Sequence, residues 1–518
     1  PDGSTLDASV TILQFADESP QSVIRVDSDG TPGATASTQF NARNNISYYA
    51  IVDGIGTGVG EYTLRVNAQP VTSTLFLPDA GTEAGRLSNL AITNPNDFDV
   101  SYRVWLRYAD GTTEVVRNST VSGQNQTLVQ LSNPAGQSAV GAKVDVPYSI
   151  EIWSDGQLAA SVISYDGRAD TGSQLTETLA PTWDFARVER RPGVASDTVT
   201  VFNPNSVAVD ITLTGYQSGT TTSVVRRVEA LQRTSWSINN LTSFPTGVFS
   251  ARVSAVAANP AQAGKVRGVV AGLRSENLAE QSGFGVLGNA DITATSGTLG
   301  SLENGSAVNA ELVVFNPGDT EITFQFTGDY TSDTLPDAQR IFNVAARSQV
   351  VLTGAEIGLA ANQPAGISYT ASGAVSVVAV ENRLGEANAR VGQTTGVTQL
   401  AFAGASLNTA TLGTQSFGWL NLHNPTTTNG RATVQIFFAD GTTASFRPFI
   451  AAGDFVSIDL AARPEIADRA GIPRFGINVF APVQITASLT QYDLALGGGW
   501  TIAGTPFGLT NSISSVQA

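Results

Sequence analysis

Apolar and polar residues alternate one by one along most of this chain, and helical spacing is nearly absent. In the run 101–108, Tyr, Val, Leu and Tyr occupy the even positions, and Ser, Arg, Trp and Arg occupy the odd ones. Ala432, Val434, Ile436 and Phe438 hold the same phase near the end of the chain. A period of two predicts strands with one face buried.

Tight turns follow these two runs. Both end in Ala-Asp-Gly-Thr-Thr, at 109–113 and at 439–443. Asp-Gly supplies the positive φ angles that a tight hairpin requires, so the aspartates are interpreted as turn formers. Ser218-Gly219 holds the corresponding place between them, and a longer loop with several aspartates lies around 329–337.

The dipeptide Asn-Pro closes a short apolar strand four times, with Asn at 94, 203, 316 and 424, which gives intervals of 109, 113 and 108 residues. This nearly constant spacing indicates internal repeats. The period is that of a small β-sandwich and is too long for a solenoid turn.

Two further strands are expected late in every repeat, at 148–152 and 159–165, 248–253 and 266–273, 367–370 and 375–380, and 477–480 and 485–492. About seven short strands per 110 residues predict an all-β chain of tandem antiparallel, immunoglobulin-like sandwiches arranged in a rod. One short helix is expected at 464–469. The predicted domains are 1–72, 73–181, 182–292, 293–400 and 401–518, the last with a C-terminal extension.

The first 70 residues follow a different pattern. Asn45–Gly54 contains Tyr-Tyr-Ala-Ile-Val-Asp-Gly, and Gly60–Val66 reads Gly-Glu-Tyr-Thr-Leu-Arg-Val. These two strands resemble the closing strands of the bacterial pre-peptidase C-terminal domain family, although the family's opening strands before Leu6 are missing. The resemblance implies a secreted, non-catalytic accessory sandwich. Residues 73–518 resemble tandem bacterial immunoglobulin-like surface domains in general.

Composition narrows the function. The chain has 518 residues, no Cys and one His, which excludes thiol nucleophiles, disulfides and Cys/His zinc sites. A net charge of −16 disfavours nucleic acid and anionic lipid as partners. No apolar stretch is long enough to span a membrane. The absence of both Cys and Met suits an extracellular or cell-surface location. Because the first residues show neither an initiator Met nor a signal peptide, a processed product is expected.

Two local motifs receive structural interpretations. His423 precedes the fourth Asn of the repeat, where Thr93, Phe202 and Phe315 stand in the other three, so a core role is expected. Asp27-Ser28-Asp29-Gly30 opens like a calcium loop but lacks the Glu at position 12, so it is interpreted as a turn. No catalytic, cofactor-binding or metal-ligating residue is assigned.

An acid closes the last strand of each repeat, with arginines nearby at Arg168, Arg274 and Arg383. These acids are Asp166, Glu276, Glu381 and Asp493. They are interpreted as ion pairs, and the alternatives are bridges between domains or Ca²⁺ ligands at the joints. Trp105 is expected to point away from its own core beside Arg103 and Arg107, which leaves carbohydrate stacking open.

These patterns predict a non-enzymatic, extracellular structural protein that assembles with copies of itself into a filament, sheath or surface layer. Segments 502–516 and 7–15 are candidate donors for strand exchange between subunits. The alternative is a monomeric adhesin or carbohydrate-binding accessory module. A third hypothesis is the non-catalytic part of a larger secreted hydrolase.

Overall fold

The structure is a computed structural model of the whole chain. It describes residues 8–16, 19–28, 35–36, 47–54, 63–64, 73–81, 86–131, 142–143, 145–165, 170–290, 292–305, 308–330, 335–383, 385–394, 396–407, 416–468, 474–493, 498–507 and 516–517. The described residues form two compact units. Unit 1 comprises Pro1–Ser73, Asp155–Gln157 and Phe507–Ala518, and unit 2 comprises Thr74–Ser154 and Leu158–Pro506.

Unit 1 contains two small antiparallel sheets. The first has the order β2-β1-β4, with β1 at Ala8–Ala16, β2 at Ser19–Ser28 and β4 at Ser47–Gly54. The second has the order β3-β41-β5, with β3 at Thr35–Ala36, β41 at Val516–Gln517 and β5 at Thr63–Leu64. Within the described residues, both candidate donor segments therefore pair inside their own chain.

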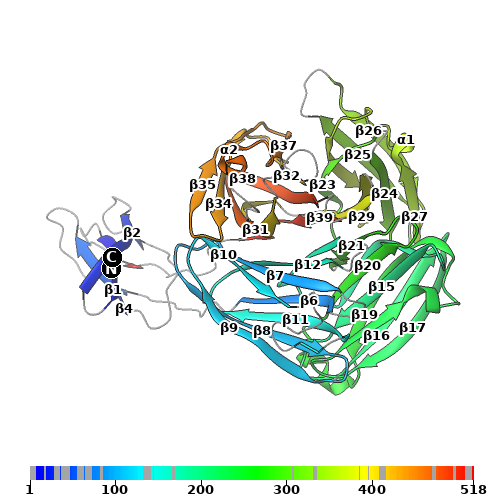
Figure 1. Ribbon diagram of the computed structural model, residues 1–518, viewed down its shortest axis with the longest axis horizontal. Coiled ribbons are helices and arrows are strands. Elements are labelled where there is room, and N and C mark those ends of the chain that lie inside the picture. The colour runs from blue at the N-terminus through cyan, green and yellow to red at the C-terminus, as the bar shows by residue number, and fades with distance from the viewer. Residues whose placement is uncertain are drawn as a thin grey trace. The chain divides into compact units, whose positions relative to one another are not determined.

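Unit 2 contains four sandwiches with one topology, coloured from blue to red in sequence order in Figure 1. Sandwich 1 is built from β6 (Ser73–Gly81), β7 (Leu87–Asn94), β8 (Val100–Tyr108), β9 (Thr113–Val121), β10 (Asn125–Gln130), β11 (Pro147–Ser154), β12 (Ala159–Tyr165) and β13 (Asp170–Gln174). Its sheets have the orders β6-β11-β8-β9 and β10-β7-β12-β13.

Sandwiches 2 and 3 repeat this pairing. Sandwich 2 contains β14 (Thr182–Arg190), β15 (Ala195–Phe202), β16 (Val209–Gln217), β17 (Thr220–Val228), β18 (Arg233–Ser237), β19 (Gly247–Ala257), β20 (Val270–Asn277), β21 (Ser282–Leu287), β22 (Asn289–Ala290) and the 3-10 helices η2 (Ile238–Asn240) and η3 (Pro260–Lys265). Sandwich 3 contains β23 (Ser296–Leu302), β24 (Val308–Asn316), β25 (Ile322–Tyr330), β26 (Ala338–Val344), β27 (Ser348–Thr353), α1 (Gly354–Ile357), β28 (Ala365–Ala371), β29 (Ser376–Arg383) and β30 (Glu386–Val391).

Sandwich 4 merges two strands into one. Its elements are β31 (Val397–Ser406), β32 (Ser416–His423), β33 (Gly430–Arg431), β34 (Thr433–Phe438), β35 (Thr443–Phe446), β36 (Phe449–Ile450), β37 (Phe455–Asp459), α2 (Pro464–Ala467), β38 (Arg474–Asp493), β39 (Gly498–Ala503) and β40 (Thr505–Pro506). The 20-residue β38 pairs with β34 through its first half and with β32 through its second half. The all-β sandwich class predicted from the alternation is confirmed.

Burial follows the predicted faces. Along β8 the even positions are buried, whereas Ser101 and Arg103 are exposed and Trp105 and Arg107 are half-buried. Ala432, Val434, Ile436 and Phe438 are buried in sandwich 4. Gly111 and Gly441 each have a φ of 83°, whereas Asp110 and Asp440 do not have a positive φ, so the glycine alone supplies the left-handed conformation in these two turns.

The repeated Asn closes the same hydrogen-bond network in all four sandwiches. Asn203 Nδ2 donates to the carbonyls of Val207, Val228 and Glu229, and its Oδ1 accepts from the amide of Asn205. Asn94, Asn316 and Asn424 repeat the pattern. All four side chains are buried. The constant spacing therefore has a structural cause.

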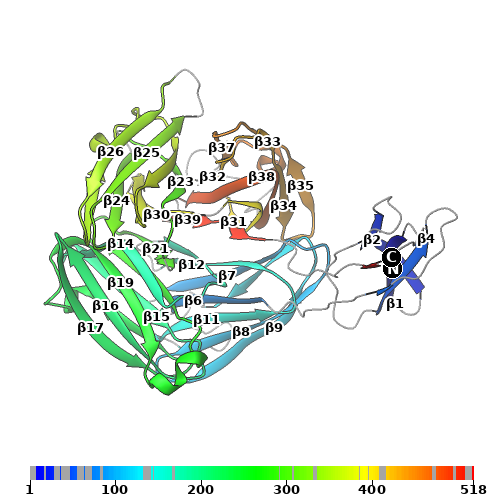
Figure 2. The same cartoon turned by 180° about the vertical axis from the view of Figure 1, so that it is seen from behind.

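The linear rod requires correction within unit 2. The last strands of the four sandwiches, β13, β21, β30 and β39, contact one another in a closed circuit, because β39 of sandwich 4 also touches β13 of sandwich 1. The views in Figures 1 and 2 show the four sandwiches packed around this junction. Alternation within single strands specifies the sandwiches but says nothing about which sandwiches then touch.

Close backbone approach lets the circuit close. A Cβ on Gly172 of β13 would lie 2.6 Å from Cβ of Trp500 in β39, so only glycine fits there. Gln174 Nε2 donates to Thr505 Oγ1 at 2.9 Å, and Ser161 Oγ donates to the carbonyl of Ala403 at 2.8 Å. Uncharged hydrogen bonds thus join sandwich 4 to sandwich 1.

Candidate functional site

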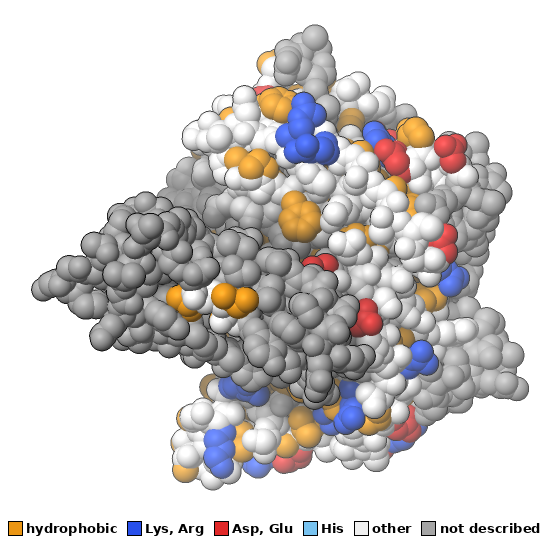
Figure 3. Space-filling view, turned by 90° about the vertical axis from the view of Figure 1, so that its left-hand side faces the viewer, with side chains coloured by type: hydrophobic (Ala, Val, Ile, Leu, Met, Phe, Trp, Pro, Cys, Tyr) orange, Lys and Arg blue, Asp and Glu red, His pale blue; other side chains and the backbone are white. Residues whose placement is uncertain are grey.

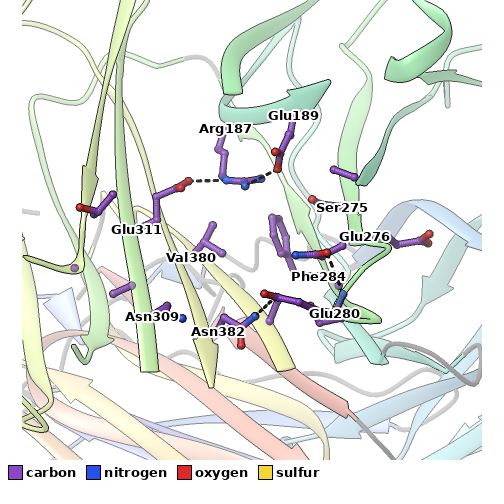
Figure 4. Close-up of a pocket in the computed structure, with 18 of the residues that line it drawn as sticks. Arg187, Glu189, Ser275, Glu276, Glu280, Phe284, Asn309, Glu311, Val380 and Asn382 are labelled. Atoms are coloured by element: carbon purple, nitrogen blue, oxygen red, sulfur yellow. Dashed lines mark hydrogen bonds and ion pairs between the residues drawn. The ribbon is translucent and has the colours of Figure 1, made fainter. Parts of the chain in front are cut away.

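A cleft of about 620 Å³ lies between sandwiches 2 and 3 (Figure 4). Sandwich 2 contributes β14 and the hairpin of β20 and β21, and sandwich 3 contributes β24, β29 and the start of α1. Strand alternation places polar side chains of these strands on the surface that each sandwich turns toward the other. The cleft therefore exists only because the two sandwiches pack together.

Arg187 lies at the wall of the cleft between two carboxylates. Its Nε donates to Glu311 Oε1 of sandwich 3 at 2.6 Å, and its Nη2 donates to Glu189 Oε2 at 2.8 Å. Its Nη1 is buried and has no hydrogen-bond partner among the described residues. A buried guanidinium N–H without a partner costs free energy, so this atom is poised to bind an acceptor.

Asp197 is hydrogen-bonded to the backbone at Glu189 and to the side chain of Ser275. Its Oδ2 accepts from the amide of Glu189 at 2.6 Å, and its Oδ1 accepts from Ser275 Oγ at 2.7 Å. Burial raises the pKa of Asp197 to about 6, against the lowering effect of Arg187. Burial alone would lower the pKa of Arg187, but the carboxylates of Glu311, Asp197 and Glu189 raise it overall, so the guanidinium stays charged.

The opposite end of the cleft presents side-chain amides. Asn382 Nδ2 donates to Glu280 Oε2 at 2.5 Å across the two sandwiches. Asn309 is exposed on β24, and Asn277 uses its Oδ1 to cap the turn at Ala279 and Glu280. Phe284 supplies the aromatic part of the wall and is buried.

This lining suits hydroxyl groups. Amide and carboxylate oxygens accept hydrogen bonds, while amide and guanidinium N–H groups donate them, so one hydroxyl can be held from both sides. The glutamates of the cleft are partly neutralised, because Glu189 also pairs with Arg191 at 2.9 Å and Glu276 with Arg274 at 3.2 Å. The site can therefore hold a neutral, hydroxyl-rich molecule.

His423 lies outside the cleft, in the core region of sandwich 4. Burial lowers the pKa of His423 to about 4, opposed by the nearby carboxylate of Asp454. Its side chain is 5% exposed. A neutral imidazole in this position contributes to packing.

The acids that close the repeats lie in different settings. Glu276 lines the cleft. Glu381 is buried, accepts from Arg390 Nη1 at 3.2 Å, and accepts from Tyr492 Oη of sandwich 4 at 3.2 Å, which makes it a bridge between two sandwiches. Asp166, Arg168 and the side chain of Asp493 lie outside the described residues. Arg383 stacks over Trp419 of sandwich 4 at 5.2 Å.

No group of three or more His, Asp or Glu side chains suited to a metal ion occurs in the described part of the chain. The calcium-loop motif at 27–30 falls on residues whose side chains lie outside that part. None of the helices described here has the length or the hydrophobicity to span a bilayer.

A second cavity, of about 470 Å³, is lined by all four sandwiches beside the junction of their last strands. Its side-chain amides already form hydrogen bonds between neighbouring sandwiches. Asn289 Nδ2 donates to the carbonyl of Gly392, and Gln393 Nε2 donates to the carbonyl of Ala487. On the face shown in Figure 3, charged side chains stand singly or in small groups among uncharged ones.

Comparisons with known proteins leave the family open. No family model and no curated protein matches the chain. Accordingly, the resemblance of residues 1–70 to the pre-peptidase C-terminal family stays a prediction.

Three solved structures are weakly similar to this chain. A crystal structure of Thermotoga maritima 1070 is 15% identical, covers 22% of this chain and 96% of its own, and has a TM-score of 0.19. A tetra-tandem repeat from the extending region of a large adhesion protein is 13% identical, covers 84% and 100%, and has a TM-score of 0.11. The chicken CNTN1 FN1–FN3 domains are 8% identical, cover 56% and 90%, and have a TM-score of 0.09. Because these scores are far below 0.5, the sandwich assignment rests on the sheet topology.

Sequence reasoning missed the cleft. Arg187 and Glu311 are 124 positions apart and belong to different repeats, so no local motif joins them. One signal was present: Arg187 and Glu189 stand on alternate positions of β14, so the two opposite charges share one face of that strand.

Proposed function

We propose that this chain is an extracellular, non-catalytic binding protein whose cleft between sandwiches 2 and 3 holds a neutral saccharide. One observation supports this function: the buried Nη1 of Arg187, which has no partner among the described residues, and the side-chain amides of Asn309 and Asn382 line the same cleft. Binding sites of this volume commonly combine an apolar wall with a few polar groups that fix orientation.

Calorimetric titration of the whole chain with ligands selected on a glycan array tests the proposal. Asn309→Ala removes a cleft amide that is exposed and forms no side-chain hydrogen bond with the described residues, so it should weaken binding at least tenfold while the melting temperature stays unchanged. Asn343→Ala on β26, outside the cleft, is the matched control and should bind like the wild type. No binding by the wild-type chain, or equal binding by Asn309→Ala, would overturn the proposal.

Self-assembly is the second candidate, favoured by one observation. The edge strands β9, β17 and β26 each expose a β-branched residue, Val115, Val225 and Ile341, at 54%, 63% and 63%. Unpaired strand edges with apolar side chains are templates for pairing with another chain. Arginines at 117, 226, 227 and 340 on the same strands limit uncontrolled association.

Negative-stain electron microscopy and sedimentation of the chain, with and without EDTA, test assembly. Regular filaments or sheets that Val225→Lys abolishes would support edge pairing, and their loss in EDTA would identify a Ca²⁺ requirement at the joints. Discrete monomers over the whole concentration range would exclude assembly.

A further inference from the structure

The outer sheet of sandwich 1 presents an aromatic and basic surface, here called the Trp–Arg face and defined by Arg103, Trp105, Arg107, Glu151 and Trp153. Arg103, Trp105 and Arg107 lie on one side of β8. Glu151 and Trp153 lie on the adjacent β11, where Glu151 pairs with Trp105 and Trp153 pairs with Arg103 in the strand register. The two tryptophans are therefore diagonal neighbours on one surface.

This surface is not required by the fold. The places of Arg103 and Trp105 relative to the repeated Asn are taken by Thr212 and Thr214, Gln325 and Thr327, and Thr433 and Gln435 in sandwiches 2, 3 and 4. The position of Trp153 in the strand register is taken by Ser254, Thr370 and Phe480. Uncharged polar residues occupy these positions on the counterparts of β8 in the other three sandwiches. The fold therefore requires neither an arginine nor a tryptophan there.

The two arginines of the Trp–Arg face differ in how many of their N–H groups are already hydrogen-bonded. Arg107 is committed, because its Nε and Nη2 donate to Glu151 Oε2 at 2.8 and 2.6 Å and its Nη1 donates to Thr113 Oγ1. Arg103 is exposed, lies 5.6 Å from the ring of Trp105, and forms no ion pair with any described residue. A guanidinium stacked on an aromatic ring keeps its N–H edges available for a carboxylate.

Trp153 supplies the complementary apolar surface, since it is 42% exposed. An exposed indole can stack on a flat ring, and an available guanidinium can bind a carboxylate. Together they match a polymer whose units carry both flat rings and carboxylates. The overall net charge of −16 would repel such a polyanion elsewhere, so attraction would be confined to a local basic surface.

We propose that the Trp–Arg face binds an anionic, uronate-containing polysaccharide, with Trp153 stacking on a sugar ring and Arg103 binding a neighbouring carboxylate. This site is separate from the cleft between sandwiches 2 and 3 and does not depend on the function proposed for that cleft.

Affinity electrophoresis of the whole chain through gels containing polygalacturonate tests the proposal, with dextran gels as the neutral comparison. Trp153→Thr and Arg103→Thr introduce residues that sandwiches 3 and 2 tolerate at these positions, and each should weaken retention at least tenfold. Val256→Thr, at an exposed apolar position on β19 of sandwich 2 that belongs to neither proposed site, should retain wild-type binding.

Retention of the wild-type chain should decrease steeply with salt, because a carboxylate–guanidinium contact is screened. Circular dichroism of each variant at the assay temperature separates loss of binding from loss of folding. Absence of retention on polygalacturonate, equal retention on dextran, or wild-type retention by both folded Trp–Arg variants would each overturn the proposal.

Discussion

The repeated Asn is the residue that specifies each sandwich most directly. Its side chain binds backbone groups from two parts of one sandwich, as Asn203 does with Asn205 and Val207 in the loop that follows it and with Val228 at the end of β17. Asn combines two donors and an acceptor in one short planar group, so no other residue type of similar size can replace it. Its recurrence was visible in the sequence, but its partners were not, because they lie up to 29 positions away.

Substitution of this residue should be costly. Asn203→Asp preserves the shape and the acceptor but removes the donors to three carbonyls, so the unfolding free energy should decrease by about 2 to 4 kcal/mol. Urea denaturation followed by tryptophan fluorescence measures this loss, with Asn118→Asp at an exposed position of β9 as the matched control. A loss below about 0.5 kcal/mol would contradict the structural role assigned to the side chain.

At the scale of elements, alternation predicted most strands and their buried faces. The short helix expected at 464–469 is confirmed as α2, Pro464–Ala467. The helix α1 was missed, although Thr353 and Glu356 form a capping box, because four residues provide too little periodicity. The continuous β38 was predicted as two strands, since Pro482 interrupts the apolar pattern where the strand passes between sheets.

A pair of acids lies between sandwiches 3 and 4, at the end of β25 and the start of β37. Burial and then the carboxylate of Asp454 raise the pKa of Asp329 to about 7, and Asp337 adds to the effect. A raised carboxyl pKa gives stability that is present below the unfolded value near 4 and is lost as the pH rises through about 7.

Asp329→Asn removes the ionisable group and therefore the loss of stability at high pH. The variant should be more stable than the wild type by about 1 to 2 kcal/mol at pH 8, a figure that allows for solvent screening of a half-exposed group, and nearly equal to it at pH 4. Thermal unfolding across this pH range provides the measurement, and Asp319→Asn on the exposed surface is the control. The same stability difference at both pH values would contradict the assignment.

At the scale of the molecule, the joints between sandwiches were beyond sequence reasoning. Asp79 of sandwich 1 lies 2.7 Å from Arg233 and 3.3 Å from Arg274, both in sandwich 2. Burial alone would raise the pKa of Asp79, but Arg274, Arg233 and Arg86 lower it overall. These partners are up to 195 positions away in the sequence and belong to no common motif.

Loss of this carboxylate should loosen the joint. Asp79→Asn leaves Arg233, which is 2% exposed in its side chain, without its counter-charge and should destabilise unit 2 by about 3 to 5 kcal/mol at pH 7. Because the pKa of Asp79 is lowered in the folded state, its contribution is present above about pH 4 and is lost as the pH falls further. Denaturation at pH 7 and pH 3 should therefore show a difference that shrinks in acid; a constant difference would contradict the ionic account.

The closed circuit of four sandwiches is the claim on which the second cavity, lined by all four of them, depends. The chain contains no cysteine, so Gln174→Cys and Thr505→Cys introduce its only two thiols, one in sandwich 1 and one in sandwich 4. A control pair, Ser250→Cys and Gln349→Cys, joins consecutive sandwiches 2 and 3 and should be close in a circuit or in a rod.

The most direct measurement is disulfide formation between residues 174 and 505 under mild oxidation, read as a mobility shift on non-reducing gels that reduction reverses. The wild-type side chains are 2.9 Å apart, so the closed circuit predicts an intramolecular disulfide, like that of the control pair. A linear series of sandwiches, each about 30 Å long, would instead separate the two thiols by about 60 Å or more, so two free thiols beside a cross-linked control pair would contradict the closed arrangement.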